Sequence, residues 1–217
     1  MEDFSKDAVI LTAFEDKEAL GLLTCDLVRR GVGLVLLIDD SSGSAAGSSA
    51  IPGLTILRQT PDRDDAPTLR DALQYLNLHR PDMEYAAVLE SAGDCSAENI
   101  AGLLAAVHGR KRLLAVSLRR PGRGVSFLSW RRNRLNCLLP RLVSGEGEAE
   151  SLRSSRAFST QLIPQFLTVE GEGQAYHLNC LLACISTGIA LEEVLFPVKE
   201  EKIEYRIPEF LKSIIPG

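Results

Sequence analysis

The stretch that decides the fold is AVILTA at residues 8–13, followed by DKEALGLLTCDLVRR at 16–30 and LVLLID at 34–39. The first and third segments are continuous apolar runs, which are typical of strands buried on both faces of a parallel sheet. The middle segment carries its apolar residues at helical spacing, as an amphipathic helix does. This order predicts a strand–helix–strand unit with two neighbouring parallel strands.

The same alternation continues along the chain. The helix in the middle of the sequence has Ser96 as its N-cap and Gly109 as its terminator, although Asn99 stands where Glu or Gln would complete a capping box. The expected elements after the first unit are a flexible loop at 41–53, a strand at 54–57, a helix at 67–79 with Pro67 in its first turn, a strand at 85–90, a helix at 96–109 and a strand at 113–118.

Beyond residue 125 the pattern becomes more polar. The expected elements are a basic amphipathic helix from Ser126, a polar loop at 143–152, a short helix near 157–163, a helix through 177–185, a strand around 193–198 and a final helix from Pro208. Strands that alternate with helices over residues 1–217 indicate one α/β domain, a doubly wound, mostly parallel central sheet with helices on both faces. In such sheets, ligands bind beyond the carboxyl ends of the strands.

Composition excludes a disordered, a collagen-like and a coiled-coil protein. The chain has 217 residues, of which 45% are hydrophobic and 24% are charged, close to globular averages. Its longest weakly polar run, residues 178–191, is shorter than the roughly 20 apolar residues that span a bilayer. The acidic start MEDFSKD lacks the basic region of a secretory signal. We therefore expect a cytoplasmic protein.

The cysteines and histidines form no local metal motif. No two cysteines have CxxC spacing, so paired zinc knuckles are excluded and buried thiols are expected. The histidines lie far apart in the sequence and are expected at the surface or at helix ends. These residues are Cys25, Cys95, Cys137, Cys180 and Cys184, with His79, His108 and His177.

The net charge of −5 conceals a basic tract. Residues 110–141 contain ten Arg or Lys and no Asp or Glu, which leaves −15 on the rest of the chain. This segment indicates a positive face. Only Phe127 and Trp130 supply aromatic rings within it, so a nucleic-acid partner is not expected. A phosphate-bearing small molecule and an anionic membrane surface stay open as partners, beside a solvated helix that pairs with Glu146, Glu148 and Glu150.

Acidic residues follow three of the predicted strands. Glu15 and Asp16 follow the first strand, Asp39 and Asp40 the second, and residues 90–94 the fourth. Single carboxylates at such positions often cap helices, whereas a cluster can hold a divalent cation or bind a nucleobase and ribose. The absence of a glycine-rich loop after the first strand speaks against an NAD-type Rossmann site and against a P-loop ATPase.

The order of these segments resembles that of family 2 glycosyltransferases, nucleotide-sugar enzymes of the GT-A type that include the polyprenyl-phosphate sugar synthases. VILTAFEDKEAL resembles the family's opening strand with Pro-Thr-Phe or Tyr-Asn-Glu, and LLIDDSS resembles Val-Val-Asp-Asp-Gly-Ser. DRDDAPTLRDAL resembles Asn-Arg-Gly-Lys-Gly-Ala-Ala-Leu-Arg, and AVSLRRPGRG resembles Val-Gly-Ser-Arg. SSRAFSTQLI resembles Ser-Gly-Phe-Arg-Ala-Phe, and EEVLFPVK resembles Glu-Val-Pro-Ile. The resemblance covers nearly the whole chain.

The resemblance implies a site for a nucleoside-diphosphate sugar. The nucleotide-binding residues that it implies are Phe14, Glu15, Asp39, Asp40 and Arg70. Positive side chains would offset the charge of the pyrophosphate or of an acceptor phosphate. These residues are Arg119, Arg156, Arg131 and Arg132.

The metal-binding part of the family's site is altered. Glu90-Ser91-Ala92 stands where the family has its metal-binding DxD motif, and an alanine side chain cannot coordinate Mg²⁺ or Mn²⁺. Glu90 and Asp94 are the remaining candidate ligands, so the need for a metal cofactor stays open. Asp64-Asp65 also replaces the family's Gly-Lys beside a phosphate site.

Two functions follow from this mixture of matches and departures. One is transfer of a sugar from a nucleotide to a phospholipid or glycan acceptor, with arginines in place of the metal. The other is a catalytically inactive relative that acts as a binding, regulatory or scaffold module. In either case the basic tract at 110–141 would allow peripheral contact with a membrane.

Overall fold

The computed structural model describes residues 2–12, 17–38, 51–57, 68–89, 96–119 and 155–196. The elements in this part of the chain are, in order, β1 (Asp7–Leu11), α1 (Lys17–Arg29), β2 (Leu34–Ile38), β3 (Leu54–Leu57), α2 (Leu69–His79), β4 (Tyr85–Leu89), α3 (Ala97–Val107), β5 (Leu113–Arg119), β6 (Arg156–Ser159), the 3₁₀ helix η3 (Thr160–Leu162), α5 (Ile163–Leu167), α6 (Gly173–Ser186) and β7 (Ala190–Phe196).

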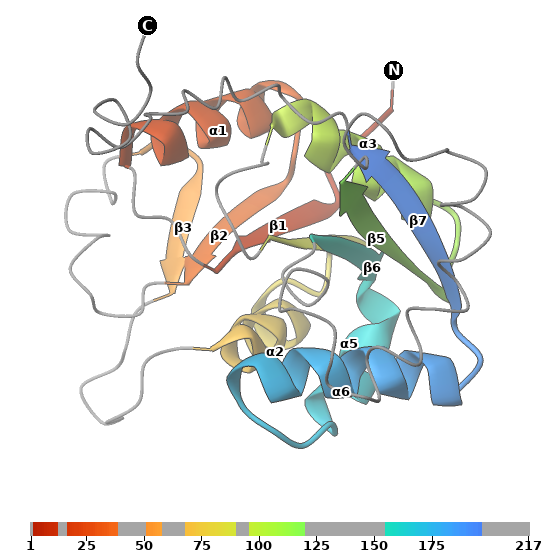
Figure 1. Ribbon diagram of the computed structural model, residues 1–217. Helices are drawn as coiled ribbons and strands as arrows, with labels where there is room; N and C mark the ends of the chain where they lie inside the picture. Colours follow the sequence, from red (N-terminus) through yellow and green to blue (C-terminus); the bar gives the residue numbers. More distant parts are fainter. Residues whose placement is uncertain are drawn as a thin grey trace, which may run out of the picture.

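The strands form one seven-stranded sheet in the order β3-β2-β1-β4-β6-β5-β7 (Figure 1). β1 to β4 run parallel to one another, and β7 runs parallel to β5. β6 lies between β4 and β5 and is antiparallel to both. The predicted doubly wound, mostly parallel α/β architecture is therefore confirmed.

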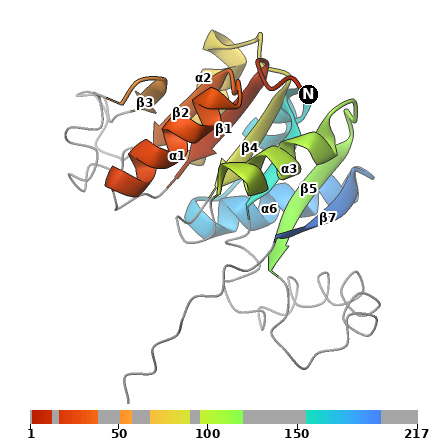
Figure 2. The same cartoon turned by 90° about the horizontal axis from the view of Figure 1, so that it is seen from above.

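Helices cover both faces of this sheet, as the sequence predicts. α1 and α3 lie on one face, and α2, α5 and α6 lie on the other (Figures 1 and 2). Successive residues of a strand point to opposite faces, so Val9 and Leu11 of β1 join the α1/α3 core, whereas Ala8 and Ile10 join the α2/α6 core. The continuous apolar runs of the sequence reflect this burial on two sides.

The predicted start of α2 needs a correction. Pro67 was expected in the first helical turn, but the helix begins at Leu69 with Thr68 as its N-cap. The Thr68 side chain accepts a hydrogen bond from the Asp71 backbone, and the Asp71 carboxylate accepts one from the Thr68 backbone. This capping box satisfies the first donors of the helix and so sets its start. The predicted cap of α3 is confirmed, because Ser96 accepts from the Asn99 backbone.

A second correction concerns residues 156–163, where the sequence predicted a short helix near 157–163. Residues 156–159 form the strand β6, and helical structure begins only at Thr160. β6 is buried along its whole length between two partner strands. Pairing on both sides outweighs the local preference of these four residues.

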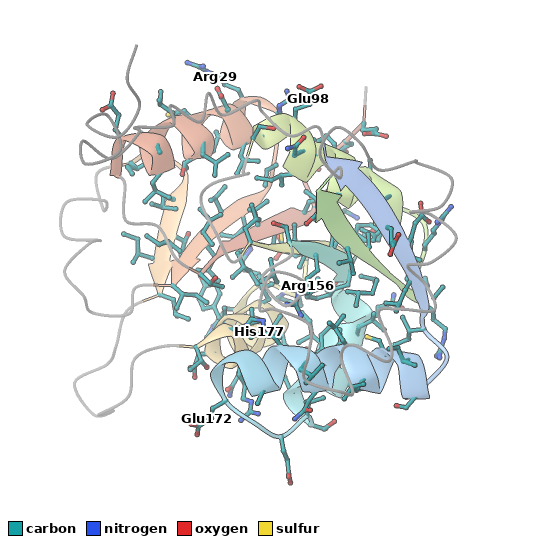
Figure 3. The ribbon with its side chains drawn as sticks, viewed as in Figure 1. Arg29, Glu98, Arg156, Glu172 and His177 are labelled. Carbon is teal, nitrogen blue, oxygen red and sulfur yellow. The ribbon has the colours of Figure 1, made fainter. Side chains whose placement is uncertain are left out.

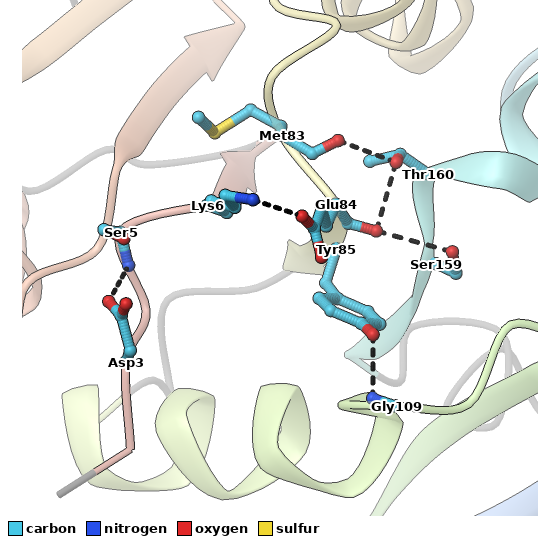
Figure 4. Close-up of polar contacts among 9 residues, drawn as sticks. All are labelled: Asp3, Ser5, Lys6, Met83, Glu84, Tyr85, Gly109, Ser159 and Thr160. Atoms are coloured by element: carbon cyan, nitrogen blue, oxygen red, sulfur yellow. Dashed lines mark hydrogen bonds and ion pairs between the residues drawn. The ribbon is translucent and has the colours of Figure 1, made fainter.

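The amino edge of the sheet is joined by a network of polar contacts (Figure 4). Lys6, just before β1, forms an ion pair of 2.5 Å with Glu84, just before β4. The Thr160 hydroxyl donates to the carbonyl oxygens of Met83 and Glu84, and Gly109 donates its backbone N–H to the Tyr85 hydroxyl. The network connects the starts of β1 and β4 to the ends of β6 and α3.

A buried carboxylate lies at the same edge. Asp7 is fully buried, and its Oδ2 lies 2.7 Å from Nε2 of His108, the C-cap residue of α3. The His108 ring packs between Phe4 and Tyr85, with ring centroids 5.5 and 4.8 Å away. Burial raises the pKa of Asp7, while the hydrogen bond and charge of His108 lower it by less. His108 was predicted at a helix end, but not its pairing with Asp7.

Several predictions lie outside the described residues. These are the helix from Ser126, the loop 143–152, the helix from Pro208 and most of the loop 41–53. β7 is the strand expected around 193–198, and it begins earlier, at Ala190. Within the described ranges, no helix has the length and apolar character needed to cross a membrane.

Candidate functional site

The order of the strands reverses its direction at β1, which marks one point on the carboxyl edge of the sheet. The chain passes from β1 to β2 in one direction, and β4 lies on the opposite side of β1. This reversal makes the boundary between β1 and β4 the topological switch point, and open α/β sheets bind ligands beyond the strand ends at such a point. Thr12, one residue beyond β1, donates both its backbone N–H and its hydroxyl to the Leu89 carbonyl, each at 3.0 Å. The two strand ends are thus joined by hydrogen bonds at this edge.

Six of the predicted site residues follow, within five positions, strands that end at this edge. β1, β2 and β4 have their last residues at Leu11, Ile38 and Leu89. The structure describes the strand ends, and the side chains predicted beyond them lie outside the described residues. Those are Phe14, Glu15, Asp39, Asp40, Glu90 and Asp94, together with Arg131 and Arg132 of the basic tract.

Two predicted arginines come from neighbouring strands at the same edge. Arg156 is the first residue of β6 and pairs in register with Val88 of β4 and Val116 of β5. Arg119 is the last residue of β5, three positions beyond Val116. A strand rises about 3.3 Å per residue, so about 10 Å along the sheet separates the two backbone positions. The side chain of Arg119 lies outside the described part of the structure.

Arg156 is a buried cation that contacts helix α6. It is 4% exposed, and it donates from Nη1 to the His177 carbonyl at 3.3 Å and from Nη2 to His177 Nδ1 at 3.2 Å (Figure 3). Since a guanidinium only donates hydrogen bonds, Nδ1 of His177 acts as the acceptor in this contact. Sequence reasoning assigned no role to His177, because the contact joins residues that are far apart in the chain.

Arg70 lies near the start of α2 and reaches the loop between α5 and α6. Its Nη2 donates to the carbonyl oxygens of Val169 at 2.6 Å and Gly171 at 3.2 Å. Its guanidinium lies over the ring of Tyr176, 4.7 Å from the centroid. The structure therefore brings Arg70 and Arg156 to α6, through Tyr176 and His177 respectively.

An open cavity of about 580 Å³ borders this loop. It is lined by Arg70 and by residues 167–172, which include the carboxylates Glu170 and Glu172. A guanidinium and two carboxylates can together donate and accept hydrogen bonds, as a hydroxyl-rich ligand requires. The cavity lies on the α2/α6 side of the carboxyl edge, because α5 runs toward that edge and α6 runs away from it.

The thiols of α6 are buried and not suited to act as nucleophiles. Burial raises the pKa of Cys184 to about 12 and also raises the pKa of Cys180. Both side chains therefore stay protonated at neutral pH, and the prediction of buried apolar thiols is confirmed for these two residues. Within the described ranges, no group of three His, Cys, Asp or Glu side chains could hold a metal ion.

No protein-family model and no curated protein matches the chain. Solved structures do match it. Mannosyl-3-phosphoglycerate synthase from Rubrobacter xylanophilus superimposes with a TM-score of 0.58 at 14% identity, over 91% of this chain and 68% of that one. Glucosyl-3-phosphoglycerate synthase from M. tuberculosis gives 0.57 at 19% identity, over 93% and 76%. The fold is of the GT-A, nucleotide-diphospho-sugar transferase type.

A third solved structure widens the range of activities found on this fold. CMP:2-keto-3-deoxy-manno-octonic acid synthetase, complexed with CTP, superimposes with a TM-score of 0.55 at 10% identity, over 96% of both chains. At such identities the likeness is one of fold. The expected resemblance to GT-A type enzymes holds at that level, without singling out family 2.

Proposed function

We propose that the chain binds a nucleoside-diphosphate sugar at the carboxyl edge, across the switch point between β1 and β4. The observation that carries this proposal is the GT-A type sheet, whose strands β1, β2 and β4 end at one edge directly before the acidic segments of the sequence. Asp39 and Asp40 follow β2 and would accept hydrogen bonds from the base and ribose. Phe14 and Glu15 follow β1 and would complete the nucleoside pocket.

The reaction that this site supports best is transfer of the sugar without a tightly bound metal. A departing nucleoside diphosphate needs positive charge, which Mg²⁺ or Mn²⁺ commonly supplies. Ala92 stands in place of the second aspartate of the DxD motif, so Arg119 and Arg156 are the proposed source of that charge. Support for this assignment comes from their origin on the neighbouring strands β5 and β6 at the carboxyl edge.

The second candidate function is binding without catalysis, favoured by the same Glu90-Ser91-Ala92 segment. In this case the nucleotide crevice would regulate or scaffold an assembly that handles glycans. The two candidates share the nucleotide site and differ in whether a sugar is transferred.

A calorimetric titration tests the shared part of the proposal. The ligands are UDP-, GDP-, dTDP- and CMP-linked sugars and CTP, each with and without Mn²⁺. We expect one nucleotide to bind, with Mn²⁺ changing Kd by less than about tenfold, equivalent to about 1.4 kcal/mol. The double variant Asp39→Asn with Asp40→Asn should weaken binding at least about tenfold, because it removes two charged acceptors.

The matched control is Asp26→Asn, which changes an exposed carboxylate of α1 that pairs with Arg29. It should bind as the unmodified protein does. Absence of binding to every nucleotide would contradict the proposal, and tightening by Mn²⁺ beyond tenfold would show that a metal site survives. With the bound nucleotide sugar identified, release of the nucleoside diphosphate onto phospholipid and glycan acceptors separates transfer from binding alone.

A further inference from the structure

Arg70 joins two parts of the chain that are far apart in sequence. Its Nη2 donates to carbonyl oxygens 99 and 101 residues away, those of Val169 and Gly171. Its ring contact with Tyr176 adds attraction between a cation and an aromatic face. Its partners among the described residues are thus two neutral carbonyls and an aromatic ring, and all of them belong to the α5–α6 loop or to the first turns of α6.

The α5–α6 loop, residues 168–172, is also fixed from its other side. The Tyr176 hydroxyl donates to the Phe166 carbonyl at 3.0 Å, and the Asn179 amide donates to the Glu170 carbonyl at 3.0 Å. Gly171 has φ +109°, and a Cβ there would lie 3.2 Å from atoms of Tyr176 and Asn179. The loop is therefore packed closely against α6, and Arg70 is its contact with α2.

Two of the three nitrogens of Arg70, Nη2 and Nε, are directed at the protein itself. Nη2 already serves two carbonyl oxygens of the loop. Nε is enclosed, without a hydrogen-bond partner among the described residues. A buried N–H group without an acceptor costs free energy. The other contacts of the Arg70 side chain therefore hold Nε in this position.

We propose that Arg70 is a positioning residue, which fixes the α5–α6 loop as a wall of the open cavity and does not contact the nucleotide. This departs from the nucleotide-binding role that the resemblance implies for Arg70. It rests on the proposed function in one respect, namely that the cavity serves the second substrate of the transfer. The shape of the loop would then depend on Arg70, and nucleotide affinity would not.

Hydrogen exchange of the free protein tests the positioning role without any ligand. Arg70→Met keeps an unbranched stem as long as the arginine side chain up to Nε, and it removes the donors and the charge. We expect the backbone amides of residues 169–173 to exchange at least about tenfold faster, because the loop opens locally. Arg80→Met is the matched control, since Arg80 lies at the other end of the same helix and contacts Asp82 and Met83.

Chemical rescue distinguishes positioning from a general loss of stability. In Arg70→Ala, added ethylguanidinium should restore slow exchange in the loop, whereas ethylammonium should not, because only a planar guanidinium can lie over the Tyr176 ring while one of its nitrogens donates to both carbonyls. Unchanged exchange of the loop in Arg70→Met would overturn the proposal. Exchange that rises equally in β1, β2 and the loop, without rescue, would also overturn it.

The nucleotide titration supplies the second readout. Arg70→Met should bind the nucleotide sugar within about threefold of the unmodified protein, whereas KM for the second substrate should rise, as expected when a cavity wall is displaced. A tenfold or greater loss of nucleotide affinity in Arg70→Met would make Arg70 a nucleotide ligand and overturn the proposal. If the unmodified protein binds no nucleotide, the proposed function fails, and the exchange experiment still decides whether Arg70 positions the loop.

Discussion

The guanidinium of Arg156 is a buried charge held by the backbone and ring of His177. Removing it leaves a cavity and deprives buried acceptors of their donor. We expect Arg156→Ala to lower the free energy of unfolding by about 2–4 kcal/mol, measured by urea denaturation. Arg29→Ala is the control, because that side chain is 79% exposed, and it should change stability by less than about 0.5 kcal/mol. Equal stability of the two variants would contradict this prediction.

Asp7 gives the stability of the protein a specific dependence on pH. Burial raises its pKa above the ordinary value of about 3.9, so the protonated form favours folding. The stability that Asp7 contributes is complete below about pH 4 and is lost as the pH rises through the folded-state pKa. We expect the free energy of unfolding of the unmodified protein to exceed that of Asp7→Asn most strongly near pH 4, and this difference should shrink toward pH 7. Urea denaturation across that pH range measures it.

Asp82 provides a control with the opposite sign. The hydrogen bond from Arg80 lowers the pKa of Asp82, so its contribution is present above the unfolded pKa and is lost as the pH falls. The free energy of unfolding of Asp82→Asn should therefore be slightly lower than that of the unmodified protein at neutral pH and equal to it at low pH. An advantage over Asp7→Asn that grows with pH would mean that the pairing with His108 outweighs the burial of Asp7.

Elements were predictable where their signal is local. β1, β2 and α1 follow from continuous apolar runs and helical spacing, and the Ser96 cap follows from residue type. β6 was predicted wrongly, since four residues that begin with a buried arginine carry no strand period and gain their strand geometry from two distant partners. Pro67 misled the prediction of the start of α2, because Thr68 and Asp71 form a capping box after it.

Substituting a glycine by alanine tests how closely two elements approach each other. A Cβ on Gly33 would lie 2.0 Å from the carbonyl oxygen of Ser5, so the start of β2 and the N-terminal segment would have to separate. We expect Gly33→Ala to lower the free energy of unfolding by about 2–4 kcal/mol. Gly102→Ala, in an exposed position of α3 with nothing within 4 Å of the new Cβ, should instead raise it by about 0.5–1 kcal/mol. Thermal unfolding of both variants is the measurement, and destabilisation by both would contradict it.

At the scale of the whole molecule, the two edges of the sheet carry different groups of contacts. The amino edge holds the network around Lys6, Glu84 and Thr160, with the pair of Asp7 and His108 beside it. The carboxyl edge holds the switch point and the cavity. The sequence predicts a ligand site at the second edge, because acidic segments follow the strands, and that site stays a prediction. The contacts of Arg70 and Arg156 join positions too far apart in the chain for a pattern to reveal.

The basic tract at 110–141 leads to a prediction about partners. Among its described members, Arg110 pairs with Glu192, and Arg112 donates to the Thr187 carbonyl, so these two cations are used within the protein. We propose that the rest of the tract faces an anionic surface, where each Lys or Arg adds about 1 kcal/mol of attraction. The protein should sediment with anionic vesicles at low salt and not at high salt.

A charge-matched pair of variants separates this surface from net charge alone. Arg131→Glu with Arg132→Glu should abolish sedimentation with anionic vesicles. Arg29→Glu with Arg30→Glu, two exposed positions at the carboxyl end of α1, changes the net charge equally and should retain sedimentation. Equal recovery of the unmodified protein in the supernatant with neutral and anionic vesicles would contradict the membrane partner.

The insertion of β6 between β4 and β5 also sets the order in which the sheet can be completed during synthesis. β5 emerges from the ribosome before residue 156 does, yet it has no hydrogen-bonded contact with β4 except through β6. Until then β4 and β5 each present an unpaired edge, which is a template for association with other chains. The facing edges of β4 and β5 therefore stay unpaired in the nascent chain between the emergence of residues 119 and 159, and the four residues of β6 then cover both of them.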